Sequence, residues 1–354
     1  MPVAIFLLFL QPGFSQSKWS ELDQELQAKQ KLLGTNVVAL IWKADSLIYK
    51  REMVDFNIKT QAPIASCSKW LTAALIMVLV DEGKLGLDDK IGRYIPEFNR
   101  YGKSYITVRN CLSHMTGIED EGNLLKKLFQ RKKFSTLEEE VNSFATGREI
   151  RANPGTDFWY GNIGLNIAGR VAEVVTKKKF DLLIKQKLFT PLAMRKTTFS
   201  TLDASAVNPS GGAQSTAEDY MKFLVMLLNK GKYNGVQVIS EKSIELMMQL
   251  QASPEMVKYA PKAAEGYGYA LGSWVVESSV NPGFSTVGSE DISQKKTSPT
   301  ALASPGLFGT WPMIDYCRGY AYLVFVKSLL GEERADAHRE LKKVVDKQLP
   351  SICN

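Results

Sequence analysis

Ser66 and Lys69 stand three positions apart in the segment SCSK, and their types and spacing suggest chemistry. In a helix, residues i and i+3 lie on one face, so the hydroxyl and the amine would meet. A serine hydroxyl is a good nucleophile only when a base takes its proton, and a lysine in an apolar setting can become that base. Backbone N–H groups at a helix N-terminus would also stabilise an oxyanion beside Ser66.

The S-x-x-K spacing is weak evidence when it stands alone. It also occurs at Ser15–Lys18 and Ser293–Lys296, where no buried helix is expected to follow. A serine that merely caps a helix at position 66 would give the same pattern. The interpretation of Ser66 as a nucleophile therefore depends on partners elsewhere in the chain.

Tyr160 and Asn162 are candidates for those partners, because they form the only Y-x-N in the chain and precede an expected helix. A tyrosine phenol near a lysine ammonium can shuttle protons. An asparagine amide can bond both a substrate carbonyl and the lysine. The alternative is a tyrosine on a helix shoulder followed by a helix cap.

A third segment, Ser304–Leu307, reads SPGL and precedes an expected strand. Gly306 would allow close approach of the backbone, and the Leu307 N–H could point at a bound carbonyl. Taken alone, an edge-strand entry marked by proline and glycine explains the segment equally well.

Elements that could position these residues follow from the hydrophobic pattern. Trp70–Val80 is apolar on all sides and predicts a buried helix that stops at Glu82-Gly83. Asn36–Lys43 and Ser46–Met53 predict a β-hairpin around Ala44-Asp45. We also expect helices over 18–31, 162–177, 216–229 and 335–348, strands over 267–277, 307–314 and 320–326, and a loop over 285–300.

Strands at both ends with helices between them predict one mixed sheet assembled from the two termini, with a helical domain inserted. The expected α/β sandwich takes residues 16–85 and 255–354, and the helical domain takes residues 86–254. A cleft between the two parts is the natural place for a site.

Composition is that of an ordinary globular protein, with 45% hydrophobic and 23% charged residues among 354. That excludes a disordered tail protein, a collagen-like chain and a polytopic membrane protein. The net charge of +7 is mild for this length. The basic clusters Arg131–Lys133 and Lys177–Lys179 are expected to be solvated helix ends. We expect no nucleic-acid partner, although contact with anionic envelope polymers is a possible minor role.

The first residues resemble an export signal. Val3–Leu10 is an unbroken apolar run, too short to span a bilayer. Gly13 and Ser15 are small residues suited to a cleavage site after Ser15. We therefore expect residues 1–15 to be a signal peptide and the protein to be periplasmic or extracellular, although no Lys or Arg precedes the run and a buried N-terminal strand is the alternative.

Export implies an oxidising compartment in which cysteines can pair. The four cysteines allow three complete pairings, and the sequence does not choose among them. The chain has no C-x-x-C and its only histidines are His114 and His338, so we expect no zinc site and no other metal or cofactor.

The three candidate segments, in this order, resemble the motifs of the serine β-lactamase and penicillin-binding-protein superfamily. The likeness is to class C β-lactamases, D,D-peptidases and related family VIII-like esterases, and it covers roughly residues 30–345. It extends to ITVRNCLSHMTGI (106–118), LFTPLAMRKTTF (188–199) and PSGGAQSTAEDYMKFLVMLL (209–228). The resemblance implies an antiparallel sheet from both termini, flanked by helices, and an inserted all-helical domain.

Carried over by motif, Ser66 would be the acylated nucleophile and Lys69 would assist its deprotonation. Tyr160 would be the acid/base for the leaving group and the hydrolytic water. Asn162 would position the substrate, and the Ser66 and Leu307 N–H groups would form the oxyanion hole. Whether Lys69 or Tyr160 takes the first proton stays open because the pair is coupled. The substrate would be a small ester, amide or peptide; the oligomeric state is left open.

The third motif departs from the family pattern, which has Lys-Thr-Gly or His-x-Gly. Here Ser304 takes the position of the cation and Pro305 that of the threonine, while Gly306 matches. A cation and a hydroxyl at these positions would bind a substrate carboxylate. We therefore expect poor binding of β-lactam carboxylates, unless Lys295, Lys296 or Arg318 compensates.

Two other functions are weaker alternatives. A Ser-His-Asp hydrolase would need His114 or His338, and the chain has no G-x-S-x-G elbow. A penicillin-binding or sensor-type protein that acylates but turns over slowly would explain the altered third motif. The intact set Ser66, Lys69, Tyr160 and Asn162 argues instead for an enzyme.

Overall fold

The computed structural model describes residues 18–120, 134–279, 298–329 and 333–353. Its centre is a seven-stranded sheet in the order β2-β1-β13-β12-β11-β10-β9. The strands are β1 (Val37–Lys43), β2 (Ser46–Met53), β9 (Gly268–Tyr269), β10 (Trp274–Ser279), β11 (Ser298–Ala303), β12 (Trp311–Asp315) and β13 (Tyr320–Val326). Every neighbouring pair is antiparallel. The expectation of a mixed sheet is therefore wrong, and the antiparallel sheet implied by the resemblance is confirmed.

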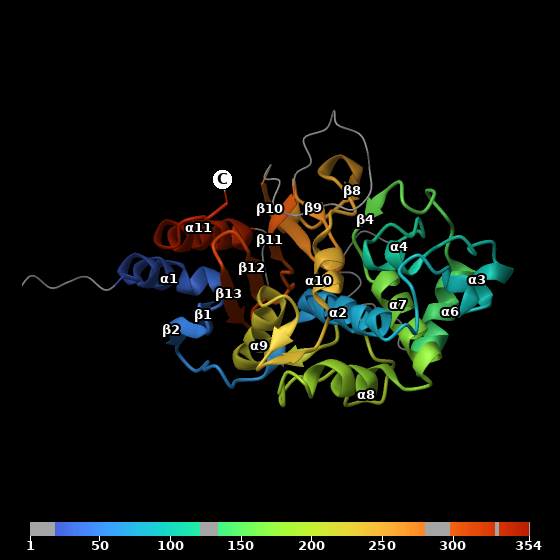
Figure 1. The fold of residues 1–354 in the computed structure, drawn as a ribbon, viewed down its shortest axis with the longest axis horizontal. Helices are drawn as coiled ribbons and strands as arrows, with labels where there is room; N and C mark the ends of the chain where they lie inside the picture. Colours follow the sequence, from blue (N-terminus) through green and yellow to red (C-terminus); the bar gives the residue numbers. More distant parts are fainter. Residues whose placement is uncertain (1–17, 121–133, 280–297, 330–332, 354) are drawn as a thin grey trace, which may run out of the picture.

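Helices cover both faces of the sheet, and Figure 1 shows α1 (Ser20–Leu33) beside α11 (Glu333–Gln348) on one of them. Side chains alternate along β1 because successive residues of a strand point to opposite faces. Val37, Ala39 and Ile41 join the cluster under α1 and α11. Val38 and Leu40 join the other cluster, with α2 (Ser68–Asp81) and α9 (Ala217–Leu228). The chain termini thus build one three-layer sandwich.

Of the remaining helices, α3 (Glu97–Arg100), α4 (Val108–Leu112), α6 (Leu137–Gly147) and α7 (Ile163–Thr176) gather at the other end of the molecule (Figure 1). Helix α8 (Phe180–Ile184) packs on α7, and α10 (Glu241–Met248) packs on α2 near the middle of the molecule. Shorter elements are β3 (Ala62–Pro63), β4 (Phe158–Trp159), β5 (Gln214–Ser215), β6 (Lys232–Tyr233), β7 (Val236–Gln237), β8 (Val257–Tyr259), and the helical turns Ala65–Cys67, Ile91–Arg93, Lys185–Phe189, Pro254–Met256 and Lys262–Ala264.

Local sequence explains where several helices begin. The side chains of Thr107, Thr136, Thr216 and Ser240 each accept the backbone N–H three residues later, which satisfies a donor that the helix leaves unpaired. The predicted hairpin is confirmed, with Ala44 and Asp45 both at positive φ in its turn. The predicted helices of the N- and C-terminal segments are confirmed within about two residues, the usual scatter of helix ends.

Three strand predictions need correction. Residues 267–277 form two strands, β9 and β10, because Gly272 turns the chain at φ +82. The strand expected over 307–314 begins only at Trp311, because Gly306 N–H bonds Thr310 O and closes a turn first. Residues 298–300 belong to β11 and not to the expected loop, whose earlier part lies outside the described residues.

Some expectations stay predictions. The domain boundaries near residues 85 and 255 follow from the sequence argument alone. The signal peptide over 1–15 and the cluster Arg131–Lys133 lie outside the described residues. Within the ranges that the structure covers, no helix has both the length and the apolar character needed to cross a membrane.

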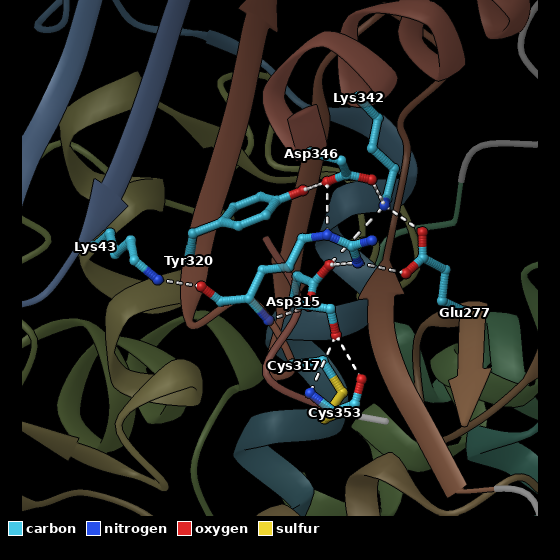
Figure 2. Close-up of polar contacts among 10 residues, drawn as sticks. Lys43, Glu277, Asp315, Cys317, Tyr320, Lys342, Asp346 and Cys353 are labelled. Atoms are coloured by element: carbon cyan, nitrogen blue, oxygen red, sulfur yellow. Dashed lines mark hydrogen bonds and ion pairs between the residues drawn. A yellow bond between two sulfur atoms is a disulfide. The ribbon is translucent and has the colours of Figure 1, made fainter. Parts of the chain in front are cut away.

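A disulfide and a network of charges tie the C-terminal helix to the sheet (Figure 2). Cys317, in the turn between β12 and β13, is bonded to Cys353 beyond α11. The neighbouring Arg318 Nη1 lies 2.8 Å from Asp315 Oδ2 and 2.8 Å from Glu277 Oε2. Lys342 of α11 bonds Glu277 and Asp346. Cys67 and Cys111 are buried and form no disulfide, so the four cysteines form one disulfide, between Cys317 and Cys353.

The disulfide leads to the first prediction. Cys353→Ser should lower the free energy of unfolding by about 2–4 kcal/mol, because the bond closes a loop between residues 36 apart and restricts the unfolded chain. Denaturant unfolding measures the change. A reductant should lower the stability of the wild type by a similar amount and leave that of Cys353→Ser unchanged. Equal stability of the oxidised wild type and the variant would contradict the prediction.

Candidate active site

Ser66 lies in the helical turn Ala65–Cys67 that leads into α2, at the N-terminus where the sequence placed it. Ala65 has φ +45, an unfavourable conformation for a residue with a side chain, and such strain is frequent beside functional groups. The Tyr220 hydroxyl of α9 donates to Cys67 O at 2.9 Å and so helps to hold this turn in place. Burial raises the pKa of the neighbouring Cys67 thiol, so Cys67 is no rival nucleophile.

Lys69 is 1% exposed, and its ammonium faces oxygen atoms from three segments. Nζ lies 3.3 Å from Ser66 Oγ, 3.2 Å from Asn162 Oδ1 and 2.8 Å from the backbone oxygen of Ser210. Three acceptors match the three N–H donors of an ammonium group. The lysine therefore links the nucleophile to the Y-x-N segment, as the S-x-x-K interpretation required.

Tyr160 follows β4 and is 3% exposed. Its phenol lies close enough to Ser66 for that serine to lower the pKa of the phenol, and the Lys69 Nζ lies 4.9 Å from the centre of its ring. Burial raises the pKa of the phenol and outweighs the effect of Ser66. The ring packs between His114, at 4.7 Å between centroids, and Trp274, at 5.2 Å. Tyr160 is therefore a rigidly packed phenol beside the candidate nucleophile.

Helix α7 brings two asparagines to the site. Asn162 caps its N-terminus and accepts from Lys69, whereas Asn166, one turn later, accepts the Ser210 N–H through Oδ1 at 3.0 Å. Ser210 is the residue whose carbonyl binds Lys69. One face of α7 thus holds Lys69 both directly and through Ser210.

The segment Ser304–Leu307 lies at the end of β11, against the helical turn Ala65–Cys67 that carries Ser66, the nucleophile turn. A Cβ on Gly306 would stand 2.2 Å from Ile64 O, so only glycine permits this approach. Ser304 is 3% exposed, and its hydroxyl donates to Gly272 O at 3.2 Å and reaches Ser66 O at 3.5 Å. The hydroxyl is therefore bonded to the backbone of two neighbouring turns.

The cations that could replace the missing family lysine do not do so within the described residues. The Arg318 guanidinium is bonded to Glu277 and Asp315 and lies 3.5 Å from Asp346, beside α11. Lys295 and Lys296 lie outside the described residues. A carboxylate does approach the site, because Asp120 Oδ2 accepts the Asn162 N–H at 3.3 Å.

The structure therefore brings Ser66, Lys69, Tyr160 and Asn162 together and places the Ser304 segment beside them. Sequence reasoning missed Asn166, Asp120 and the Ser210 carbonyl. The spacing of Asn162 and Asn166 was a signal, since residues i and i+4 share a helix face. A backbone carbonyl leaves no signal of this kind. In the described part of the chain, no group of three or more His, Cys, Asp or Glu side chains could hold a metal ion.

A separate cavity of about 550 Å³ lies among α6, α7, α8 and the loop near residue 204. It is lined by the basic run Lys177–Lys179 and by Arg170, whose guanidinium is paired with Glu138 and Glu173. None of the motif residues lines this cavity. It belongs to the helical part and not to the site around Ser66.

Comparisons with known proteins agree with this geometry. The family model for beta-lactamase matches residues 21–347. Penicillin-binding protein 4 of Amycolatopsis lactamdurans is 25% identical over 299 residues, covering 74% of this chain and 77% of that protein. Among solved structures, a Bacteroides dorei chain provisionally assigned as a beta-lactamase superposes with a TM-score of 0.79 at 24% identity, covering 94% of this chain and 98% of that one.

A second solved structure, EstCE1, is titled a hydrolase with promiscuous acyltransferase activity. It superposes with a TM-score of 0.72 at 18% identity and covers 93% of this chain and 97% of its own. Identities this low show the shared fold, and the family match extends over most of the chain. The chain therefore belongs to the beta-lactamase family and has the fold of the beta-lactamase and penicillin-binding-protein serine hydrolases.

Proposed function

We propose that the protein is an exported serine hydrolase that cleaves an ester or amide through an acyl-enzyme on Ser66. The observation that carries the proposal is the position of Lys69 Nζ, 3.3 Å from Ser66 Oγ, 3.2 Å from Asn162 Oδ1 and 4.9 Å from the centre of the Tyr160 ring. A nucleophile, two proton-transfer groups and an orienting amide thus share one buried site.

The reaction runs in two steps. The first step starts from the form of the coupled Lys69 and Tyr160 pair that has lost one proton, because only that form can accept another. Ser66 Oγ attacks the substrate carbonyl, its proton passes to the pair, and Tyr160 donates a proton to the departing alcohol or amine. In the second, water attacks the acyl-enzyme and gives a proton to Tyr160. The carboxylic acid leaves as Ser66 recovers its proton, so both steps balance.

Charge on the carbonyl oxygen has to be stabilised during both steps. The Ser66 N–H at the start of α2 and the Leu307 N–H after Gly306 are the proposed donors. The close packing of Gly306 on Ile64 supports this assignment, because it holds Leu307 next to the nucleophile turn.

The substrate class follows from the third motif. Pro305 has neither a hydroxyl nor an N–H, and the Ser304 hydroxyl is bonded to backbone oxygens. A substrate carboxylate would therefore lack the cation and hydroxyl that bind it in relatives with Lys-Thr-Gly. We propose that the enzyme prefers small esters or amides without that carboxylate, and the similarity to the hydrolase EstCE1 is in line with this preference.

Export is part of the proposal. The apolar run Val3–Leu10 with small residues at positions 13 and 15 fits a signal peptide cleaved after Ser15. The bond between Cys317 and Cys353 supports an oxidising compartment, which means the periplasm or the cell exterior. Anionic envelope polymers would then be available to the basic run Lys177–Lys179.

The second candidate is a penicillin-binding or sensor-type protein that is acylated and releases the acyl group slowly. The altered third motif and the similarity to a penicillin-binding protein favour it over other non-enzymatic functions. The two candidates differ in how long the acyl group stays on Ser66.

Intact-protein mass spectrometry tests the proposal directly. Incubation with a short-chain p-nitrophenyl ester should give a Ser66-dependent burst of p-nitrophenol and turnover, and Ser66→Ala should give neither. Benzylpenicillin run in parallel should leave little adduct. A penicillin adduct that persists for hours would favour the sensor, and absence of both adduct and turnover with either reagent would contradict the enzyme.

The carboxylate preference has its own test. Phenyl and 3-carboxyphenyl esters of the same acid differ only by a carboxylate on the leaving group. We expect kcat/KM for the carboxylated ester to be no higher than for the uncharged one, because Ser304 and Pro305 offer that carboxylate no cation where relatives have the lysine of Lys-Thr-Gly. A tenfold preference for the carboxylated ester would overturn this assignment of substrate class.

Gly161 provides a test of the site geometry. A Cβ at this position would stand 1.8 Å from Asp120 Oδ2, so Gly161→Ala must displace either the Asp120 carboxylate, which accepts the Asn162 N–H, or the backbone between Tyr160 and Asn162. Displacements near 1 Å lower rates by about 10²-fold, and we expect a loss in kcat of that order. Gly147→Ala is the matched control, because a Cβ there meets nothing within 4 Å. Equal activity of the two variants would refute the geometry.

A further inference from the structure

The four backbone N–H groups from Trp159 to Asn162 run from the last residue of β4 to the N-cap of α7, where neither a regular sheet ladder nor a helix satisfies all of them. Each is nevertheless accepted by another part of the chain. Trp159 N–H bonds His114 O at 3.0 Å, Tyr160 N–H bonds Tyr259 O at 3.0 Å, Gly161 N–H bonds His114 Nδ1 at 3.4 Å and Asn162 N–H bonds Asp120 Oδ2 at 3.3 Å. The backbone that carries Tyr160 and Asn162 is thus held by hydrogen bonds to residues of other segments.

His114 supplies two of these four acceptors. It is 4% exposed and lies in the left-handed region at φ +57, so its carbonyl and its ring both face the Trp159–Gly161 backbone. The same ring packs against the ring of Tyr160 at 4.7 Å between centroids. One side chain therefore contacts both the backbone and the ring of the candidate acid/base.

The bond from Gly161 determines which nitrogen of His114 carries the proton. Nδ1 accepts the Gly161 N–H, so the neutral ring is protonated on Nε2, and that nitrogen lies 3.1 Å from the Tyr269 hydroxyl. Tyr269 of β9 is 1% exposed, and burial raises the pKa of its phenol. The Tyr269 hydroxyl in the sheet thus fixes the orientation of the imidazole, whose tautomer follows from the Gly161 bond.

We propose that His114 is a positioning residue for acyl transfer: its Nδ1 holds the Gly161 N–H, with Tyr269 fixing the ring, so that the Tyr160 phenol and the Asn162 amide face Ser66. The proposal rests on the proposed hydrolase function. The ring nitrogens of His114 bond Gly161 and Tyr269, so its part in the reaction is to act through Tyr160 and Asn162.

Two substitutions at the same position separate this role from simple packing. His114→Asn keeps an acceptor where Nδ1 was, tolerates the left-handed backbone and removes the ring. His114→Phe keeps an aromatic ring and removes the acceptor. If the hydrogen bond matters, the asparagine variant should be the more active. If only the aromatic packing matters, the phenylalanine variant should be.

The experiment measures acylation and KM with a p-nitrophenyl ester, together with hydrogen–deuterium exchange of a peptide covering residues 158–163. We expect His114→Phe to lower the acylation rate by about 10–100-fold and to leave KM within about threefold of the wild-type value. A rate loss of this size is expected when catalytic groups are displaced by about 1 Å. Exchange in the peptide should rise in the same variant. His114→Asn should be acylated at least tenfold faster than His114→Phe and should restore the protection of this peptide from exchange.

His338→Phe is the matched control, because His338 is the only other histidine and is also buried. Its ring stacks on Trp311 at 4.6 Å, and neither ring nitrogen has a hydrogen-bond partner among the described residues. This variant should leave the acylation rate and the exchange of residues 158–163 unchanged. A similar loss in both histidine variants would show a general effect of replacing a buried imidazole and would overturn the proposal.

Tyr269→Phe keeps the experiment decisive if a His114 variant fails to fold. It removes only the partner of Nε2, and we expect a loss of about 3–10-fold in acylation, the range of one neutral hydrogen bond, with faster exchange at residues 158–163. Unchanged rate and exchange in this variant, or higher activity of His114→Phe than His114→Asn, would overturn the positioning role. A wild type without Ser66-dependent acylation would instead overturn the hydrolase function, and the exchange data would still decide whether His114 holds the turn.

Discussion

The site depends on one buried charge, the ammonium of Lys69. Removing an ammonium group from water costs several kcal/mol unless its hydrogen bonds are replaced. Here the replacement comes from Ser66, Asn162 and Ser210, which lie in segments far apart in the sequence. Lys69 can therefore be buried only when α2, α7 and the loop before β5 have all reached their places. The site is therefore complete only when these segments are packed together.

The same constraint explains why so much polar structure surrounds the site. The Ser210 carbonyl can serve Lys69 only if Ser210 is itself held, and Asn166 holds its N–H. The loop is fixed further by the Thr72 hydroxyl, which donates to Pro209 O at 2.6 Å, and by Ser68 Oγ, which accepts the Ala213 N–H at 3.0 Å. Both hydroxyls belong to α2, as Lys69 does. The apolar helix α2 thus carries polar side chains at the positions where they hold the loop that binds Lys69.

The fold and the centre of the site could be predicted from the sequence because both depend on local patterns. The apolar run of α2, the hairpin turn at Ala44-Asp45 and the spacing of Ser66 and Lys69 are signals within one or two turns of chain. The errors arose where long-range packing decides. Gly272 breaks the strand expected over 267–277 because the turn presses on α2, where a Cβ would stand 2.6 Å from Ala73 Cβ. Asp120 and the Ser210 carbonyl meet the site only through tertiary contacts.

Ser304 illustrates how a changed residue can change its task. At the position of a substrate-binding cation stands a short hydroxyl that reaches the carbonyls of Gly272 and Ser66. Those two contacts tie the end of β11 to the β9–β10 turn and to the nucleophile turn at once. Ser304 is 3% exposed, so its hydroxyl acts within the framework and not at the surface. Together with the close packing of Gly306 on Ile64, these contacts make the third motif part of the framework that holds Ser66.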